Sequence, residues 1–325
     1  MNRRQFFMQA ALATAVIGNI PNLAVAGQEA PQTTGTKRKQ AGYYWFSVGD
    51  VDVLALSDGT LRSHAKLLND KPGQVDALLR QAHVPNPRIT SVNAYLLVLG
   101  DRRVLVDAGT GDLLGPSLNK LPESLAAAGF APGQITDILL THIHADHSGG
   151  LTMQGRMVFP NATVHVSRAE KAFWLDPANM DKARENHKPM FVKARESLEP
   201  YVAAGRLVTF EAGQTGVPGI TSRPSTGHTP GHTFYVLDSQ GQRLVFWGDT
   251  VHVAEAQFPC PELAIEYDID PEAAVRARQQ AMEEAAREGH LVAGAHIAFP
   301  GIGHVSQAGQ GYQWIPAPYA YDAIG

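Results

Sequence analysis

Hydrophobic and polar residues follow each other along this chain in a pattern that predicts alternating strands and helices. Short apolar runs bounded by Gly, Asp, Asn or Pro are typical of buried strands. They occur at Val51–Leu56, Ala94–Leu99, Arg103–Val106, Ile135–Leu140, Met157–Phe159, Thr163–Val166, Leu207–Phe210, Phe234–Leu237, Arg243–Trp247 and Leu291–Ala293. Helical spacing and end signals predict helices over Ser117–Ala128, Pro189–Ala204 and Pro271–Glu288. Because the strands are distributed along the whole chain, we expect an α/β fold with two β-sheets flanked by helices.

The N-terminal residues have the pattern of an export signal. Residues 1–26 contain no Asp or Glu, and run from Arg3-Arg4 through an apolar stretch to Ala24-Val25-Ala26. A charged start, a short apolar segment and a small-x-small end are typical of a secretory signal. Because two phenylalanines follow the arginine pair closely, the segment resembles a twin-arginine signal. We expect cleavage near Ala26 and a periplasmic or secreted protein, with an uncleaved anchor as the alternative.

The rest of the chain divides into a short tether and one domain. Residues 27–41 are rich in Gln, Thr, Gly and Lys and cannot bury enough apolar surface to fold, so we expect a flexible tether. Residues 42–325 then form a single domain. After the signal, no stretch is long and apolar enough for a membrane span, so we expect no permanent membrane anchor.

Composition excludes several classes of protein. The chain has 325 residues and a formal net charge of -4, and this acidic balance argues against a nucleic-acid partner. A single cysteine, Cys260, excludes an intrachain disulfide and a cysteine-rich zinc site. Histidine, in contrast, occurs 13 times and is concentrated in a few segments. Any metal site must therefore use imidazole and carboxylate ligands.

The densest of these segments follows directly on an apolar strand. Its sequence is Thr141-His-Ile-His-Ala-Asp-His147, which places four candidate ligands within six residues. Alternate side chains at a strand end point to one side, so His142 and His144 can face a common point, while Asp146 and His147 reach a second one. Imidazole and carboxylate groups suit zinc and related divalent metals. The segment therefore predicts a metal site rather than a group of surface histidines.

Three further segments also carry His or Asp residues that could bind a metal. A tight loop carries His228 and His232 in the sequence GHTPGH, and Asp249 follows a strand in the sequence GDT. His296 lies just after the last predicted strand, with His304 in the segment beyond it. An aspartate in a turn or a histidine in a Gly-Pro loop is often only solvated. All of these pieces in this order favour one shared site.

The order HxHxDH, GHTPGH, GDT and a late histidine resembles the metallo-β-lactamase superfamily over about residues 43–320. The resemblance implies an αββα sandwich with two divalent metal ions, zinc first and Mn, Co or Fe as alternatives. One metal would be bound by His142, His144 and His228, and the other by Asp146, His147 and His296. Asp249 would bridge the two. Asp107, His232 and His304 would support the ligands.

Within the superfamily, the chain resembles the methyl parathion hydrolase branch. The segments that carry this resemblance are Gly42-Tyr43-Tyr44, Ala55–Gly59, Phe173–Leu175 and Phe299–His304. In this branch Trp174 and Phe191 would line the substrate pocket. Leu114 stands where that branch has a phenylalanine, which leaves the substrate open between phosphotriesters, lactones and aryl esters. A homodimer is also implied.

The implied reaction is hydrolysis by a metal-bridging hydroxide, with Asp146 and Asp249 as the catalytic carboxylates. A metal ion brings the pKa of bound water down to about 7, so hydroxide is available at neutral pH. We expect an exported hydrolase of organophosphate triesters such as methyl parathion. A lactonase or aryl esterase with the same metals is the main alternative. A β-lactamase and a non-catalytic binding protein are minor ones.

Overall fold

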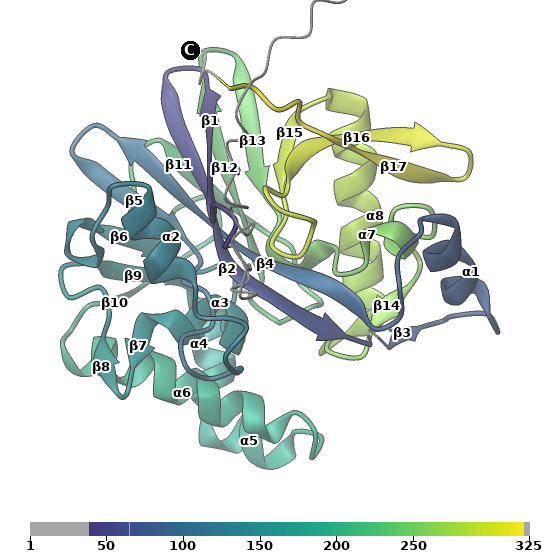
Figure 1. Cartoon of the computed structure of the whole chain (residues 1–325). Coiled ribbons are helices and arrows are strands. Elements are labelled where there is room, and N and C mark those ends of the chain that lie inside the picture. The colour runs from purple at the N-terminus through teal and green to yellow at the C-terminus, as the bar shows by residue number, and fades with distance from the viewer. Residues whose placement is uncertain (1–38, 65, 322–325) are drawn as a thin grey trace, which may run out of the picture. The chain divides into compact units, whose positions relative to one another are not determined.

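The strands of the chain assemble into two main sheets, as Figure 1 shows. The computed structural model describes residues 39–64 and 66–321. The seven-stranded sheet has the order β1 (Tyr43–Val48), β2 (Val51–Ser63), β4 (Arg88–Leu99), β5 (Arg102–Val106), β6 (Asp137–Leu139), β9 (Thr163–Ser167) and β10 (Leu207–Phe210). The six-stranded sheet has the order β11 (Ile220–Pro224), β12 (Thr233–Ser239), β13 (Gln242–Phe246), β15 (Leu291–Ala293), β16 (Ile302–Ala308) and β17 (Gly311–Pro316).

Helices and short strand pairs connect these strands. The helices are α1 (Gln74–Gln81), α2 (Leu121–Ala127), α3 (Ala145–Ser148), α4 (Arg168–Leu175), α5 (Pro177–Lys182), α6 (Lys188–Ala203), α7 (Ala254–Gln257) and α8 (Pro271–Glu288). Two small antiparallel pairs join β3 (Leu67–Leu68) to β14 (Ala264–Ile265) and β7 (Thr152–Met153) to β8 (Arg156–Met157). Both main sheets are mixed, since β5, β6, β9 and β10 run parallel in one and β13 pairs parallel with β15 in the other.

Alternation along the strands explains how the layers pack. In β2, Val53 and Ala55 point toward the second sheet, whereas Leu54 and Leu56 point the other way, because successive strand residues face opposite sides. The inner residues form a core between the sheets. The outer residues of the seven-stranded sheet pack against α2, α4 and α6, and those of the six-stranded sheet pack against α8. The predicted sandwich of two sheets flanked by helices is therefore confirmed.

The predicted elements are mostly present, with shifted ends. The strand predicted at Ala94–Leu99 begins earlier, at Arg88, and the helix predicted from Ser117 begins only at Leu121. Asn119 adopts a left-handed conformation with φ 60°, which interrupts a helix, and the Asp58 carboxylate accepts a hydrogen bond from the Leu121 backbone N–H. The sequence pattern did not predict the strands β1, β11, β16 and β17 or the helices α1 and α4.

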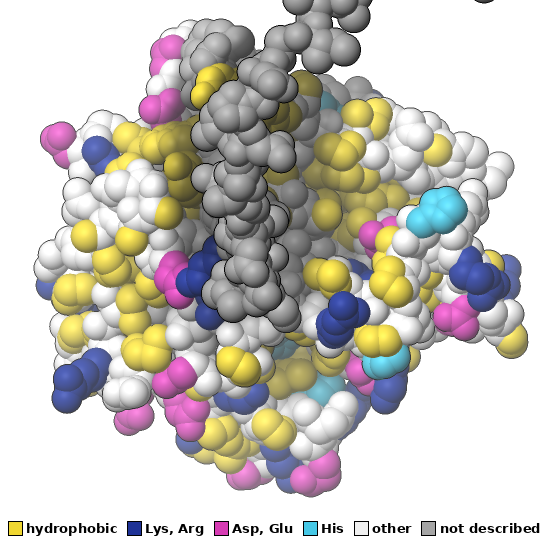
Figure 2. Space-filling model, viewed as in Figure 1, with side chains coloured by type: hydrophobic (Ala, Val, Ile, Leu, Met, Phe, Trp, Pro, Cys, Tyr) yellow, Lys and Arg dark blue, Asp and Glu magenta, His cyan; other side chains and the backbone are white. Residues whose placement is uncertain are grey.

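Two of the sequence-based expectations fall largely or wholly on residues beyond this description. The predicted signal peptide lies outside the described residues, as does the tether up to residue 38. Among the described helices, none has the length and apolar character needed to cross a membrane. On the face shown in Figure 2, the described basic and acidic side chains are interspersed.

Candidate metal centre

The candidate ligands come from loops that follow strands of both sheets. The segment His142–His147 follows β6 and enters α3, while His228 lies in the loop between β11 and β12. Asp249 lies in the single turn Gly248–Thr250 after β13, and His296 follows β15. Strand ends are a rigid base for such loops, so residues far apart in the chain meet at one edge of the sandwich.

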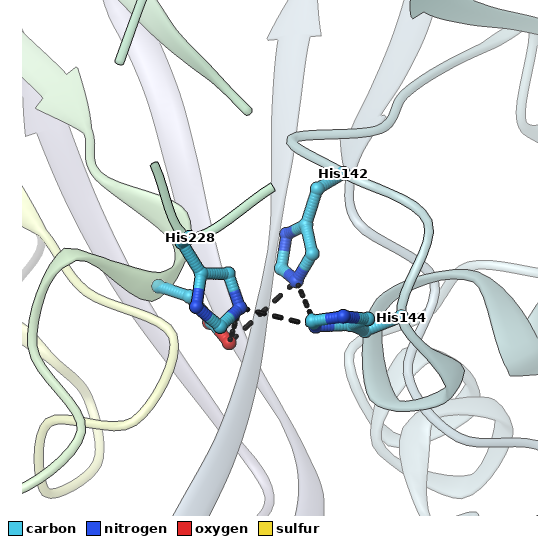
Figure 3. A group of neighbouring side chains, drawn as sticks. His142, His144 and His228 are labelled. Atoms are coloured by element: carbon cyan, nitrogen blue, oxygen red, sulfur yellow. Dashed lines mark hydrogen bonds and ion pairs between the residues drawn. The ribbon is translucent and has the colours of Figure 1, made fainter. Parts of the chain in front are cut away.

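A first donor group combines three imidazoles and one carboxylate. His142 Nε2 and His228 Nε2 each lie 3.0 Å from His144 Nδ1, and Figure 3 shows the three rings converging. Asp249 Oδ2 completes the group at 3.1 Å from His228 Nε2 and 3.6 Å from His142 Nε2. All four side chains are buried.

A second donor group shares the same aspartate through its other oxygen. Asp249 Oδ1 lies 3.0 Å from His147 Nε2 and 3.1 Å from His296 Nε2. Asp146 Oδ2 lies 3.3 Å from His296 Nε2 and 3.8 Å from His147 Nε2. Asp249 therefore presents one oxygen to each group, which is the arrangement of a carboxylate between two cations.

The arrangement of the donor atoms suits the binding of divalent metals better than hydrogen bonding among the donor atoms themselves. Within each group the potential ligand atoms lie within 4.8 Å of one another. His147 Nε2 and Asp249 Oδ1 are both buried and make no hydrogen bond, although only 3.0 Å separates them. Buried polar atoms are rarely left unsatisfied, so two such atoms directed at a shared point fit the binding of a cation between them. Imidazole nitrogen and carboxylate oxygen also suit zinc and its neighbours.

Carboxylates outside the donor groups orient the ligating rings. Asp107 Oδ2 lies 2.8 Å from His147 Nδ1, and the backbone N–H of Thr141 donates to Asp107 Oδ1. Asp268 Oδ1 stands in the same relation to His228 Nδ1, also at 2.8 Å. Such partners fix the tautomer and direction of a ligand imidazole. The structure thus places Asp107 where the sequence suggested, whereas Asp268 was missed because it lies 40 residues from its histidine in a polar turn.

The two histidines that were predicted to support the ligands differ in their position relative to the site. His232 lies beside the first group, where its Nε2 accepts a hydrogen bond from the Asp249 backbone N–H and its Nδ1 donates to the Ser225 carbonyl. His304 does not support the site. It lies on β16, opposite Ile315 of β17, and lines a separate surface hollow. The strand β16 carries it away from the ligands, so the sequence-based placement of His304 is corrected.

Electrostatics divides the histidines into two kinds. Burial, reinforced by the neighbouring imidazoles, lowers the pKa of His142 and His144 well below the usual value, so both are neutral and ready to bind metal. Burial also opposes charge on His228 and His296, but nearby carboxylates outweigh it. Asp249 and one further carboxylate in each case raise the pKa of His228 to about 9 and that of His296 to about 10. A metal must displace protons from these two rings.

A buried glutamate that sequence reasoning missed holds two ligand loops together. Glu170 Oε1 accepts hydrogen bonds from the Ile143 backbone N–H at 2.9 Å and from Trp174 Nε1 at 2.6 Å. Its Oε2 accepts from Thr229 Oγ1 at 2.7 Å and from the Gly231 N–H at 2.9 Å. One carboxylate thus links the HxHxDH and GHTPGH segments. A glutamate in a first helical turn is typically a solvated residue, so its sequence gave little sign of this role.

His252 is a further member of the site that the sequence did not reveal. It comes three residues after Asp249, in the segment that follows β13. The structure places its Nε2 3.0 Å from Asp249 Oδ2, on the side of the first donor group. Its ring is buried and lines the pocket above the ligands.

A pocket of about 360 Å³ opens onto both donor groups. Leu114 lines it, as the sequence suggested, together with Leu61, Met190 and Ile265. The predicted contacts of Trp174 and Phe191 are corrected, because both side chains are fully buried and do not line the pocket. Their rings pack against each other at a tilt of 51°, with centroids 4.6 Å apart, and the Trp174 ring lies against His144. Their role is to support the ligand loop from behind.

Two sheets flanked by helices, with a double group of imidazole and carboxylate donors at one edge, define the class of protein. A family model for the metallo-beta-lactamase superfamily matches residues 87–282, more than half of the chain. The chain belongs to the metallo-beta-lactamase superfamily.

Individual relatives share parts of the sequence. Ribonuclease TTHA0252 of Thermus thermophilus is 31% identical over 173 residues, which are 53% of this chain and 38% of that protein. The N-acyl homoserine lactonase AttM of Rhizobium johnstonii is 30% identical over 138 residues, 39% of this chain and 50% of that protein. The chain thus spans half or less of the length of these two curated relatives.

Solved structures match over most of the chain. The hydrolase AbOPH of the beta lactamase superfamily has a TM-score of 0.83 and 38% identity, covering 87% of this chain and 100% of that chain. AidC, a dizinc quorum-quenching lactonase in complex with the product N-hexnoyl-L-homoserine, has a TM-score of 0.79 and 24% identity. The match covers 86% of this chain and 98% of that chain. At that identity, the likeness to AidC shows a common fold.

Proposed function

We propose that this chain is a metal-dependent hydrolase that cleaves small lactones or aryl esters. The observation that carries the proposal is the placement of Asp249, whose Oδ2 lies 3.1 Å from His228 Nε2 and whose Oδ1 lies 3.0 Å from His147 Nε2. One carboxylate joins two donor groups beneath a pocket. Lactonases among the relatives and structural neighbours support this substrate class.

The site would hold two divalent cations, with zinc as our first choice and Mn, Co or Fe as alternatives. When bound, the cations would supply hydroxide near neutral pH and polarise the carbonyl oxygen of the substrate. The residues that would hold them are His142, His144 and His228 for one, Asp146, His147 and His296 for the other, and Asp249 for both.

The remaining residues would position the reactants. Asp107 and Asp268 hold two of the ligating rings in a fixed direction, so little reorganisation is needed during the reaction. Leu61, Leu114 and Ile265 give the pocket an apolar wall that would bind the acyl or aryl part of the substrate and limit the access of water. In this account no serine or cysteine acts as a nucleophile.

Organophosphate triesters such as methyl parathion are a second candidate substrate class. The segments that resemble methyl parathion hydrolase support it, and a triester presents the same type of target, an electrophilic centre that hydroxide can attack with loss of an alkoxide or aryloxide. Leu114 bears on the choice between the two substrate classes. It lines the pocket at the position where the methyl parathion hydrolase branch has a phenylalanine, so the pocket of this chain departs from that branch there.

Side-by-side kinetics on three substrates tests the proposal. The purified chain, loaded with zinc, is given a γ-lactone, p-nitrophenyl acetate and methyl parathion. We expect turnover of the lactone or the acetate with a kcat/KM above that for methyl parathion. A higher kcat/KM for methyl parathion would favour the second candidate, and no metal-dependent turnover of any of them would reject the proposal.

The cellular setting follows from the N-terminal sequence and is also a proposal. We infer that the protein is exported through the twin-arginine route and acts in the periplasm, or outside the cell, as a homodimer. Mass measurement of the exported protein would show a mature N-terminus near residue 27. A twin lysine in place of Arg3-Arg4 should abolish export, and sedimentation of the mature protein tests the dimer.

A further inference from the structure

Two basic side chains line the pocket above the donor groups. Arg88 is the first residue of β4 and is only 4% exposed, and Lys193 lies half-buried on α6. Among the residues that the structure describes, none forms a hydrogen bond or an ion pair with the Arg88 or Lys193 side chain. Buried cations are normally paired. This part of the pocket is different, because it carries positive charge without a contact partner.

Arg88 differs clearly from Arg278, a second deeply buried arginine among the described residues. The Arg278 guanidinium donates to the carbonyl groups of Thr250, Pro261 and Leu263, so its hydrogen-bonding capacity is used within the fold. Arg88 Nε, in contrast, is buried and has no hydrogen-bond partner. Arg278 is therefore a structural arginine, whereas the donors of Arg88 remain available to a molecule in the pocket.

The surroundings of Arg88 balance its charge only from a distance. Burial lowers the pKa of its guanidinium, and the charge of Glu255 raises it. Glu255 forms no ion pair with Arg88, and its Oε2 atom is itself buried without a hydrogen-bond partner. An oxygen-bearing ligand beside Arg88 would therefore supply the direct contact that the protein does not.

The immediate neighbours of Arg88 make a small polar patch in an otherwise apolar wall. Ser63 is its partner across the strand pair β2–β4, and Ser63 Oγ lies 2.8 Å from Thr90 Oγ1. All three residues line the pocket, next to Leu61. A few polar groups set in an apolar pocket are what fixes the orientation of a ligand.

We propose that Arg88 binds a carboxylate or another anionic oxygen group on the part of the substrate that points away from the donor groups. This inference rests on the proposed function and narrows its substrate class to acidic esters or lactones. Guanidinium pairs with a carboxylate through two parallel hydrogen bonds, which makes arginine suited to such recognition. Lys193 adds positive charge to the same pocket but keeps contact with solvent.

A matched pair of esters tests the inference by kinetics. The zinc-loaded chain and its Arg88→Met variant are compared on 4-acetoxybenzoate and on its uncharged methyl ester. We expect the substitution to lower kcat/KM for the acid by about 10- to 100-fold, which is the effect of losing a hydrogen bond to a charged group. The kcat/KM for the methyl ester should change by less than about threefold. Equal losses on both esters would overturn the inference, because a structural role for Arg88 predicts that result.

Arg62→Met is the control for removal of a nearby arginine. Arg62 is exposed on β2, is paired in register with Ile89, and does not line the pocket. This variant should treat both esters like the unsubstituted chain. A selective loss on the acid would show that general surface charge, rather than Arg88, attracts the anion.

Binding of the products separates this inference from the proposed function. Titration calorimetry on the unsubstituted zinc-loaded chain compares 4-hydroxybenzoate with methyl 4-hydroxybenzoate and needs neither turnover nor a folded variant. We expect the acid to bind at least about tenfold more tightly, with a preference that weakens at high salt. Equal binding would overturn the role of Arg88 even if both esters are hydrolysed. A preference for the acid that is lost in Arg88→Met, without any hydrolysis by the unsubstituted chain, would support Arg88 and reject the proposed function.

Discussion

The two donor groups differ in composition and in access to the pocket. The first uses three imidazoles, and all of its members are buried, whereas the second has only two imidazoles beside two carboxylates. Asp146, on the open side of the second group, keeps a side-chain exposure of 22%, compared with 3% for the shared Asp249. We infer that the first group binds its cation more firmly and that the second is where exchange with solvent is easier.

Each group has one carboxylate that orients a ligating ring. Asp268 faces His228 in the first group and Asp107 faces His147 in the second, in both cases at 2.8 Å. The similarity of these contacts makes the two groups comparable by matched substitutions. Asp249 alone belongs to both, so it should have the largest effect.

The largest expected effect is that of Asp249→Ala. Because the substitution removes an oxygen from each group, we expect the chain to lose most of its bound metal and its hydrolytic rate to fall about 1,000-fold or more. Metal analysis after dialysis and turnover of the best substrate measure both effects. His304→Ala is the control, since His304 lies outside the site and its removal should change the rate by less than about twofold. A near-normal rate in Asp249→Ala would refute the shared-carboxylate arrangement.

The next comparison removes one ring from each group. His142→Ala should empty the first group and His296→Ala the second, so each variant is expected to keep about one metal per chain and to lose about 100-fold in rate. The single ion retained by His296→Ala should resist chelators longer than the one retained by His142→Ala. If both variants lost both ions together, the groups would form one cooperative unit and the distinction would fail.

A smaller effect is expected when only the orientation of a ring is disturbed. Asp268→Asn should weaken metal binding in the first group and Asp107→Asn in the second, each by about 10- to 100-fold, because such partners tune ligand direction and basicity. Competition with a chelator of known affinity gives both values. Asp238→Asn, at an exposed carboxylate paired with Arg243, is the matched control and should have no effect. Equal weakening of both groups by either variant would contradict separate orientation.

The comparison is sharpened without any substitution by the dependence of metal affinity on pH. In the metal-free chain the pKa of His228 is raised to about 9 and that of His296 to about 10, so both rings are protonated at pH 7. Metal binding must then release protons, and the apparent affinity should rise by about tenfold per pH unit for each proton displaced, until the pH passes these values. Calorimetry in buffers of different ionisation enthalpy measures the release. An affinity that stays flat from pH 7 to 9 would contradict this account.

The sequence predicted the parts of the site that lie in short contiguous segments. His142, His144, Asp146 and His147 follow one apolar strand, and this local pattern is enough to indicate a metal site. The strand that precedes Asp249 could be predicted for the same reason, because its last three residues are a buried apolar run. The last two strands of the six-stranded sheet, β16 and β17, were missed because they alternate between apolar and polar residues and are only partly buried.

Contacts that depend on the three-dimensional packing could not be predicted. Asp268 and Glu170 are distant in sequence from the loops they hold, and each looks like an ordinary polar residue of a turn or a helix start. The family resemblance implied that Trp174 and Phe191 line the substrate pocket. Their burial behind His144 instead depends on how α4 and α6 pack. Packing likewise decides that Arg88, a polar residue at a strand end, lines the pocket.

Removal and return of metal tests whether the two donor groups hold the cations on which hydrolysis depends. The purified chain is analysed for metal, treated with a chelator, assayed on a lactone and on p-nitrophenyl acetate, and assayed again after addition of zinc or manganese. We expect about two metal ions per chain, loss of turnover on chelation, and recovery on metal return. A chain that holds no metal under any of these conditions, or that hydrolyses these substrates equally well without it, would contradict the account.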